Sequence, residues 1–219
     1  MCDRLVSDLR ARLRGRSKRD LIEGMIARSP HEPATSRMIE ALEVYPLVLL
    51  MLAHDYPTRV WLLDKGEKVS SAKILTKRML RRRWHSAAIG VDDCEGLTDV
   101  APGYLAIVTG WRTPLLMRHE FAHAVTTFFS AATRRWLCHL YHEACLSGRF
   151  AEPLARESIG EYVACGLSYY FSPDLSAELR SVDPRLYDVI DRFVGEAEHI
   201  SSRVLAAEAR GPVGRSAIV

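Results

Sequence analysis

The stretch RHEFAHAV, Arg118 to Val125, places two histidines four residues apart, with a glutamate directly after the first. Residues i and i+4 lie on the same face of an α-helix, so His119 and His123 can present two ring nitrogens to one metal ion. Zinc binds imidazole well, and a catalytic zinc site takes three protein ligands and leaves a fourth position open. The alternative is a core helix with two ordinary hydrogen-bonded histidines.

Glu120 lies roughly 100° round such a helix from His119. Its carboxylate could therefore reach a water molecule at the metal without binding the metal itself. Zinc lowers the pKa of such a water to about 7, and Glu120 could act as its general base. Thr113 and Pro114 are typical of a helix start, as N-cap and first helical residue. The motif thus predicts a catalytic helix over about 113–130.

A third metal ligand must come from another part of the chain. Glu157 and Glu161 are also four residues apart in the stretch ESIGEYVACGLSYYF, so either could face the metal, and Glu143 is a further candidate. Small residues beside Glu161 would let its helix pack closely against the histidine helix, which favours Glu161. His139 and His142 lack the i,i+4 spacing, and we interpret them as surface residues or as residues that support the ligands.

The remaining elements are predicted from hydrophobic periodicity and from turn residues. An Arg-rich amphipathic helix over 3–28 is followed by SPHEP, whose prolines disfavour helix. The expected strands cover residues 58–64, 85–91 and 103–110, with a polar loop at 92–103 between the last two. The further helices are expected over about 35–53, 70–85, 113–130, 134–147, 155–171 and 174–209, the last broken at Asp183-Pro184.

This pattern predicts an α+β fold, in which a small mixed sheet precedes a mostly helical half that carries the HExxH helix. We expect an N-terminal Arg-rich helical segment at 1–35, a main domain at 36–210 and a flexible tail at 211–219. Of the 219 residues, 48% are apolar and 26% are charged, as in a globular protein with a sizeable core. The five cysteines form no CxxC pair, so neither a disulfide framework nor a cysteine zinc cluster is indicated.

The net charge of +3 gives little support for a nucleic-acid partner. The basic tracts at 10–19 and 77–83 are interpreted as solvated helix faces, with salt-dependent nucleic-acid binding as a further alternative. The N-terminus lacks the apolar core of a secretory signal, and the longest apolar run, at 45–53, is too short to span a membrane. We therefore expect a cytoplasmic protein, or one exported by a dedicated secretion route.

Several segments together resemble the lethal-factor-like zinc metallopeptidases, which include the catalytic domain of anthrax lethal factor and the secreted Pro-Pro endopeptidases. In that family an HExxH helix is followed by a helix beginning Glu-aromatic-x-Ala and by an acidic-Pro-x-Leu-Tyr segment, and a Gly-Tyr strand precedes the HExxH helix. The matching segments here are GYLAIV at 103–108, RTPLLMRHEFAHAV at 112–125, EYVACGLSYYFSPD at 161–174 and LRSVDPRLYDVIDRF at 179–193. The order of elements agrees over about 40–200, and the residue matches lie within about 100–193.

The resemblance implies a zincin-like fold with one Zn²⁺ ion bound by His119, His123 and Glu161, and with Glu120 as general base. It also implies that the strand before the HExxH helix is the sheet edge, to which an extended peptide or protein substrate adds. That strand comprises Tyr104, Leu105, Ala106, Ile107 and Val108.

The sequence departs from the family at one functional position. Family members usually carry a tyrosine seven residues before the glutamate ligand, where its hydroxyl can stabilise the oxyanion, and this chain has Leu154 there. Loss of one such donor typically lowers the rate by about 10²–10³. Tyr141, His142 and Tyr162 are the candidates for a substitute donor. Ala122 replaces the glycine of the family's motif, which is a mild change on a helix.

The leading hypothesis is a zinc-dependent endopeptidase that hydrolyses peptide bonds, with Glu120 as base. The alternative is a zinc-binding protein of the same fold that binds a protein partner with little or no hydrolysis. Leu154 favours this alternative, and Glu120 argues against it, because a structural zinc site needs no base. No nucleic-acid or membrane partner is expected.

Overall fold

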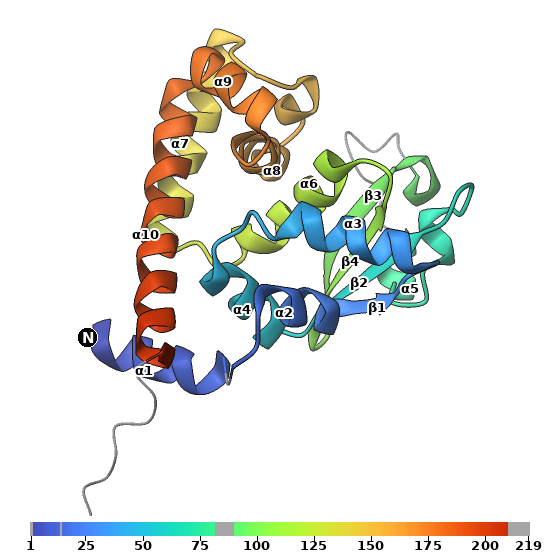
Figure 1. The fold of residues 1–219 in the computed structure, drawn as a ribbon. Coiled ribbons are helices and arrows are strands. Elements are labelled where there is room, and N and C mark those ends of the chain that lie inside the picture. The colour runs from blue at the N-terminus through green and yellow to red at the C-terminus, as the bar shows by residue number, and fades with distance from the viewer. Residues whose placement is uncertain (1, 14, 82–89, 210–219) are drawn as a thin grey trace, which may run out of the picture.

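The computed structural model describes residues 2–13, 15–81 and 90–209. Within these residues, the strands form one four-stranded mixed sheet of order β1-β2-β4-β3 (Figure 1). β1, β2 and β4 are parallel, and β3 is antiparallel to β4. The strands are β1 (Ile26–Arg28), β2 (Thr58–Leu63), β3 (Gly96–Ala101) and β4 (Tyr104–Gly110). The fold is therefore α+β, as the sequence predicts.

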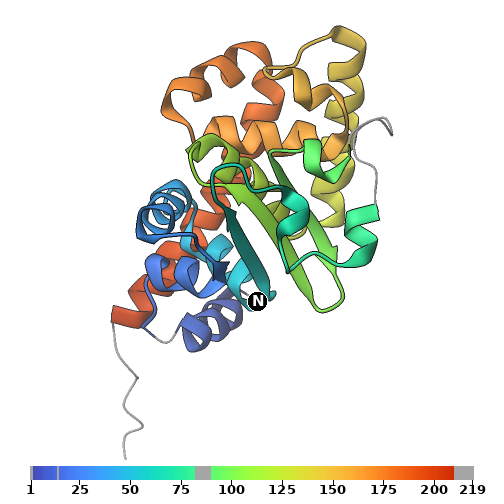
Figure 2. The same cartoon turned by 90° about the vertical axis from the view of Figure 1, so that its right-hand side faces the viewer.

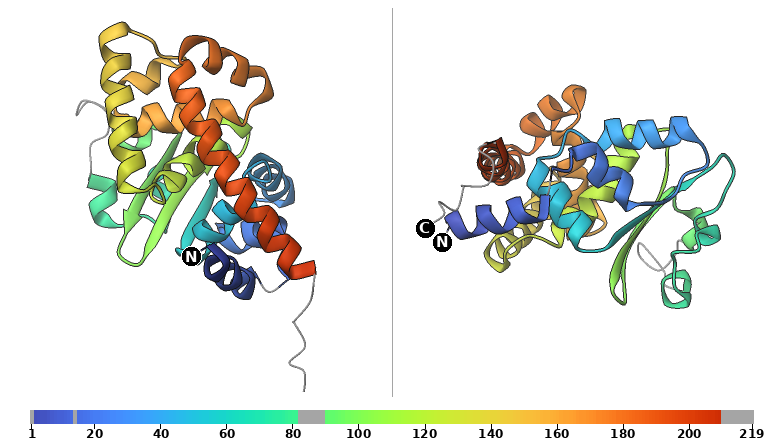
Figure 3. Two further views of the ribbon diagram at one scale, coloured as in Figure 1. Left: turned by 90° about the vertical axis from the view of Figure 1, so that its left-hand side faces the viewer. Right: turned by 60° about the horizontal axis from the view of Figure 1, so that its bottom comes forward.

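Most of the helices lie on one side of this sheet, and several extend beyond it (Figure 1). The helices are α1 (Cys2–Leu13), α2 (Lys18–Met25), α3 (Glu32–Leu42), α4 (Leu47–Asp55), α5 (Lys77–Arg81), α6 (Pro114–Thr126), α7 (Ala131–Ser147), α8 (Ile159–Tyr170), α9 (Pro173–Val182) and α10 (Pro184–Ala209). Short 3₁₀ turns lie at Val69–Ser71, Val91–Asp93 and Pro153–Arg156. The long α10 runs along one flank of the molecule, and α1 lies across its C-terminal end (Figures 1 and 3).

β4 lies inside the sheet and is buried on both faces. Leu105 and Ile107 belong to the main core shared with the helices. Ala106 and Val108 face the opposite side, where Met79 of α5 joins a smaller apolar cluster. Figure 2 views the sheet from the α5 side. Burial on both faces accounts for the continuous apolar run in this strand, which is typical of parallel strands.

The position of β4 corrects the expectation that Tyr104 to Val108 form the sheet edge. β4 pairs with β2 on one side and with β3 on the other, so its backbone groups are already engaged. The edge next to the HExxH helix is β3, which lies within the stretch 92–103 that we expected to be a loop. Glycine and aspartate make this stretch resemble a loop, but Gly103, with a φ of 82°, turns the chain so that β3 folds back on β4.

The N-terminal region departs from the single helix expected over residues 3–28. Gly15 has a φ of 74°, and Ser17 starts α2 as its N-cap in a capping box with Asp20. The chain then forms β1, a strand too short to carry an alternating pattern. The predicted segment at 1–35 thus supplies a strand of the sheet as well as helices of the main core.

Three other boundaries also differ from the prediction. The helix expected over about 35–53 is divided into α3 and α4, with Pro46 as the N-cap of α4. Of the helix expected over 70–85, the described part is α-helical only in α5, and its first residues form a 3₁₀ turn. Most of the strand expected over 85–91 and the whole tail at 211–219 lie outside the described residues. By contrast, β2, β4, α6 to α8 and the break between α9 and α10 at Asp183 confirm the prediction.

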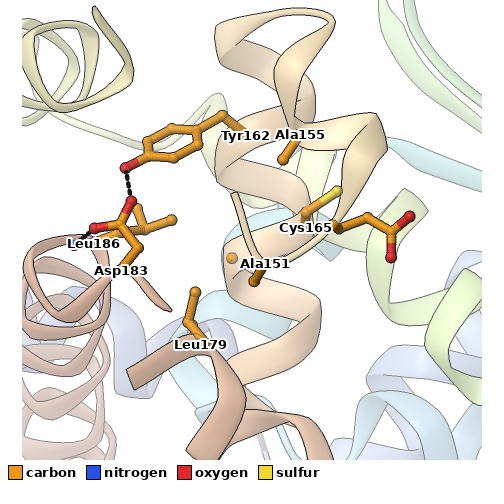
Figure 4. Close-up of a pocket in the computed structure, with 9 residues that line it drawn as sticks. Ala151, Ala155, Tyr162, Cys165, Leu179, Asp183 and Leu186 are labelled. Atoms are coloured by element: carbon orange, nitrogen blue, oxygen red, sulfur yellow. Dashed lines mark hydrogen bonds between the residues drawn. The ribbon is translucent and has the colours of Figure 1, made fainter. Parts of the chain in front are cut away.

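The second half of the chain is held together at the corner between α9 and α10. The hydroxyl of Tyr162 on α8 donates to Asp183 Oδ2 at 2.5 Å, and the backbone N–H of Leu186 donates to Asp183 Oδ1 at 3.0 Å (Figure 4). At Gly166, α8 and α10 approach so closely that a Cβ on this residue would lie 2.7 Å from Leu186 Cδ2. These contacts hold α8 in a fixed place against α10.

No helix within the described part of the chain combines the length and the apolarity that a membrane span needs.

Leu13 tests whether α1 is part of the folded core. Its side chain is 1% exposed, whereas Leu5 on the same helix is 47% exposed. Because Leu13→Ala would leave a cavity, we expect it to lower the free energy of unfolding by about 2–5 kcal/mol in urea titrations. Leu5→Ala is the matched control and should have little effect. Equal, small losses for both variants would show that α1 is not packed as described.

Candidate metal centre

The centre lies where α8 packs against α6. His119 and His123 lie on one face of α6, one turn apart. Ser158 is the N-cap of α8, and its side chain accepts a hydrogen bond from the backbone N–H of Glu161 at 3.1 Å. This cap fixes the start of α8, so that Glu161 lies in the first helical turn and Glu157 lies before the helix.

Three side-chain atoms from these two helices converge. Glu161 Oε2 lies 3.0 Å from His119 Nε2 and 3.5 Å from His123 Nε2, and the two Nε2 atoms are 3.2 Å apart. In four-coordinate zinc sites the ligand atoms lie about 2.0–2.2 Å from the metal, which separates neighbouring ligands by about 3.3 Å. The three distances therefore fit one face of a zinc coordination tetrahedron, and the donor set of two imidazoles and one carboxylate is suited to zinc.

The charges of these groups depend on one another. Burial opposes the ionisation of Glu161, but its hydrogen bonds with His119 and His123 outweigh burial and lower its pKa well below the usual range. Burial likewise opposes the charged form of His123, but the hydrogen bond with Glu161 and the nearby charge of Glu120 raise its pKa. The attraction between Glu161 and His123 thus favours the charged form of each.

Glu120 is buried beside the three converging atoms but is not one of them. Its side chain points to β3, where the hydroxyl of Thr98 donates to Oε2 at 2.8 Å. Burial is the largest influence on Glu120 and raises its pKa, against the opposing charges of His123 and His119 and the Thr98 hydrogen bond. The Glu120 carboxylate is therefore not placed to share an ion with Glu161 and the two histidines.

Cys165 contacts the far side of the His119 ring. Its Sγ lies 3.8 Å from Nδ1, whereas Nε2 of the same ring faces Glu161. His119, Glu161 and Cys165 also form a group whose ligand atoms lie within 4.8 Å of one another. Because the two nitrogens of His119 point in opposite directions, an ion bound at Nε2 cannot also be bound by the sulfur at Nδ1. Cys165 is thus placed to support His119 rather than to share its metal.

Sequence analysis did not assign a functional role to Cys165 or Thr98. Cys165 lies four residues after Glu161, so the i,i+4 spacing was a usable signal. Thr98 carried no such signal, because its segment resembled a loop. Cys165 also lines a small, partly open pocket of about 10 Å³ beside α8, which Tyr162 and Asp183 line from the other side (Figure 4).

The other acidic and histidine candidates lie apart from the converging atoms. Glu143 pairs with Arg185 and with His139, whose side chain is 57% exposed. His142 and Glu157 are exposed. The structure thus brings together Glu161 and the two motif histidines, and it leaves His139 and His142 on the surface, in line with our interpretation of them.

The candidate oxyanion donors are engaged elsewhere. Tyr162 donates to Asp183, as described above, and the hydroxyl of Tyr141 donates to the carbonyl of Arg156 at 2.9 Å. Leu154 lies in the 3₁₀ turn before α8 and is exposed. The structure therefore selects neither tyrosine as a substitute for the family's donor.

The N-terminal arginines have acidic partners. Arg10 lies 3.4 Å from Glu208, Arg12 lies 3.4 Å from Asp55, and Arg19 lies 2.9 Å from Glu23. Such pairing lowers the positive charge available to a polyanion. The second basic tract, at 77–83, lies partly outside the described residues.

The fold and the centre define an α+β protein in which two helices bring two imidazoles and a carboxylate together beside a second, buried carboxylate. A scan against protein-family models and a search of curated proteins find no match to this chain.

Glu161 and Glu157 offer a matched test of the ligand set. Because Glu161 would supply one of the three ligand atoms of the expected zinc site, we expect Glu161→Gln to weaken zinc binding by more than the roughly 10–100-fold that loss of an outer partner costs. Glu157→Gln should leave zinc binding unchanged, because Glu157 precedes α8. Zinc content after dialysis and competition with a chromophoric chelator measure both. Full zinc affinity in Glu161→Gln would remove Glu161 from the ligand set.

Cys165 offers a test of support for His119. We expect Cys165→Ala to weaken zinc binding by about 10–100-fold, because the ring would lose the partner that orients it. Cys138→Ala, at an exposed cysteine of α7, is the control and should bind zinc as the wild type does. The melting temperature of the metal-free proteins separates a general loss of stability from this effect. Unchanged zinc affinity in Cys165→Ala would show that the thiol only fills space.

Proposed function

We propose that this chain is a zinc-dependent endopeptidase with a zincin-like fold, related to the lethal-factor-like metallopeptidases that its sequence resembles. In this proposal His119, His123 and Glu161 hold one Zn²⁺ ion, and Glu120 is the general base. The observation that carries the proposal is the convergence of the three ligand atoms beside a buried carboxylate that is not among them. A purely structural metal site would not need this carboxylate.

The bound zinc would act as a Lewis acid on the peptide carbonyl and on a water molecule. Glu120 would accept a proton from that water and return it to the leaving amine. Burial raises its pKa, which is the direction that favours proton uptake by a carboxylate at neutral pH. Cys165 would orient His119 through Nδ1, and the low exposure of His119 and Glu120 would limit the access of bulk water.

The substrate would lie along β3 rather than along β4. Within the described residues β3 pairs only with β4, so its outer edge can receive an extended peptide by β-addition. β3 also contacts Glu120 through Thr98. A peptide on this edge would therefore pass beside the base and the ligands.

The alternative remains a zinc-binding protein of this fold that binds a partner with little or no hydrolysis. The exposed Leu154, at the position where the family carries its tyrosine, is the observation that favours it. The buried Glu120 favours hydrolysis instead. A peptide or protein partner, the absence of a nucleic-acid partner and a cytoplasmic location stay predictions.

Cleavage of a diverse peptide library, read by mass spectrometry, tests the proposal. We expect the zinc-loaded wild type to cut a subset of peptides, and Glu120→Gln to lower these rates by about 10²–10⁴ while it retains zinc, because only the base is lost. Glu157→Gln is the control for the loss of one carboxylate that lies apart from the converging atoms. Undiminished cleavage by Glu120→Gln would remove Glu120 from the mechanism.

Absence of cleavage by a wild type that holds one zinc would support the binding alternative. Leu154→Tyr would then test whether the oxyanion donor alone is missing, since one such donor is worth about 10²–10³ in rate.

A further inference from the structure

The hydroxyl of Thr98 lies between two acceptors of the same residue. Its Oγ1 is 2.8 Å from Glu120 Oε2 and 2.9 Å from the backbone carbonyl oxygen of Glu120. A hydroxyl has one hydrogen to donate, and a charged acceptor forms the stronger bond. When the Glu120 carboxylate is ionised, we therefore expect the Thr98 hydrogen to go to Oε2 rather than to the backbone carbonyl.

The backbone of β3 confines the same carboxylate from a second position. Gly96 lies two residues before Thr98 and so faces the same side of the strand. A Cβ at this position would lie 2.3 Å from Glu120 Oε1 and 2.8 Å from Glu120 Cδ. Only glycine leaves room for the carboxylate here. Thr98 and Gly96 together form the contact surface of β3 for the base.

A buried glutamate without such a contact would have other conformations available. Its side chain has several rotatable bonds, and its carboxylate needs a hydrogen-bond partner when it is removed from water. Thr98 supplies that partner from the strand next to the HExxH helix, not from the helix itself. The strand that carries Thr98 is also the edge to which the substrate would add.

We propose that Thr98 is a positioning residue, which holds the Glu120 carboxylate through Oε2 and so fixes the base to the strand that binds the substrate. The kinetic consequence of this inference rests on the proposed endopeptidase function. The contact itself can be tested without any activity. Because one strand positions both the base and the substrate, pairing of the substrate with β3 places the scissile bond in a fixed position relative to the base.

Thr98→Val is the sharpest variant, because valine has nearly the shape of threonine and suits a strand, but lacks the hydroxyl. Thr98→Ser keeps the hydroxyl and should rescue the effect. Thr109→Val is the matched control, since Thr109 is a buried threonine of β4 whose hydroxyl donates to the Gly110 carbonyl and not to Glu120.

A double-mutant cycle on unfolding of the metal-free protein tests the contact directly. It compares Thr98→Val, Glu120→Ala and the double variant by urea titration. We expect the double variant to lose less stability than the sum of the single variants, and the same cycle with Thr109→Val to be additive. Additivity for Thr98→Val would overturn the inference, whatever the enzyme activity.

Kinetics on a peptide found in the library test the consequence. We expect kcat of zinc-loaded Thr98→Val to fall about 10²-fold with little change in KM, because a base displaced by about 1 Å costs that much. Thr98→Ser should keep most of kcat, and zinc content should be equal in all variants. Wild-type kcat in Thr98→Val would overturn the inference even where the cycle shows coupling. Coupling without hydrolysis by the wild type would uphold the contact and count against the endopeptidase function instead.

Discussion

The packing of α8 against α6 is the contact on which the centre depends. It places Glu161 against His119 and His123, so that a carboxylate and two imidazoles share a largely buried space. A carboxylate removed from water needs partners that replace its hydration, and here the two imidazoles supply them. The same proximity that lowers the pKa of Glu161 gives the three atoms the spacing that the proposed zinc site would need. The corner at Asp183 and the close approach at Gly166 hold α8 in the position that this arrangement requires.

β3 completes the centre from the opposite side. It closes the sheet next to α6, presents its outer edge, and contacts Glu120 through Thr98 and Gly96. The centre is thus built from three elements with separate tasks. In the proposed zinc site, α6 and α8 would supply the ligands and β3 would hold the base. Glu120 and Glu161 have opposite pKa shifts although both lie beside the same histidines: burial is the largest influence on Glu120 and raises its pKa, whereas at Glu161 the hydrogen bonds with His119 and His123 outweigh burial and lower the pKa.

Local patterns in the sequence predicted the parts that depend on local geometry. The i,i+4 histidines, the Thr113-Pro114 start and the break at Asp183 all act within a few residues, and α6 and the α9–α10 corner follow from them. Whether Glu157 or Glu161 faces the histidines depends on where α8 begins, and the N-cap Ser158 sets that start. β3 and the inner position of β4 depend on pairing between distant strands. The continuous apolar run of β4 was a usable signal for an inner strand, but nothing in the pattern of residues 92–103 indicated a strand that pairs with it, and Thr98 could not be found before β3 was known.

X-ray absorption at the zinc edge of the zinc-loaded protein tests the central claim most directly. It reports which elements are bound to the metal, and sulfur is distinguished from nitrogen and oxygen because Zn–S bonds are about 2.3 Å and the others about 2.0–2.2 Å. The account predicts a first shell of nitrogen and oxygen alone, from His119, His123, Glu161 and solvent. A sulfur atom in the first shell would contradict it, because Cys165 would then be a ligand and the Nε2 arrangement on α6 and α8 would not be the metal site.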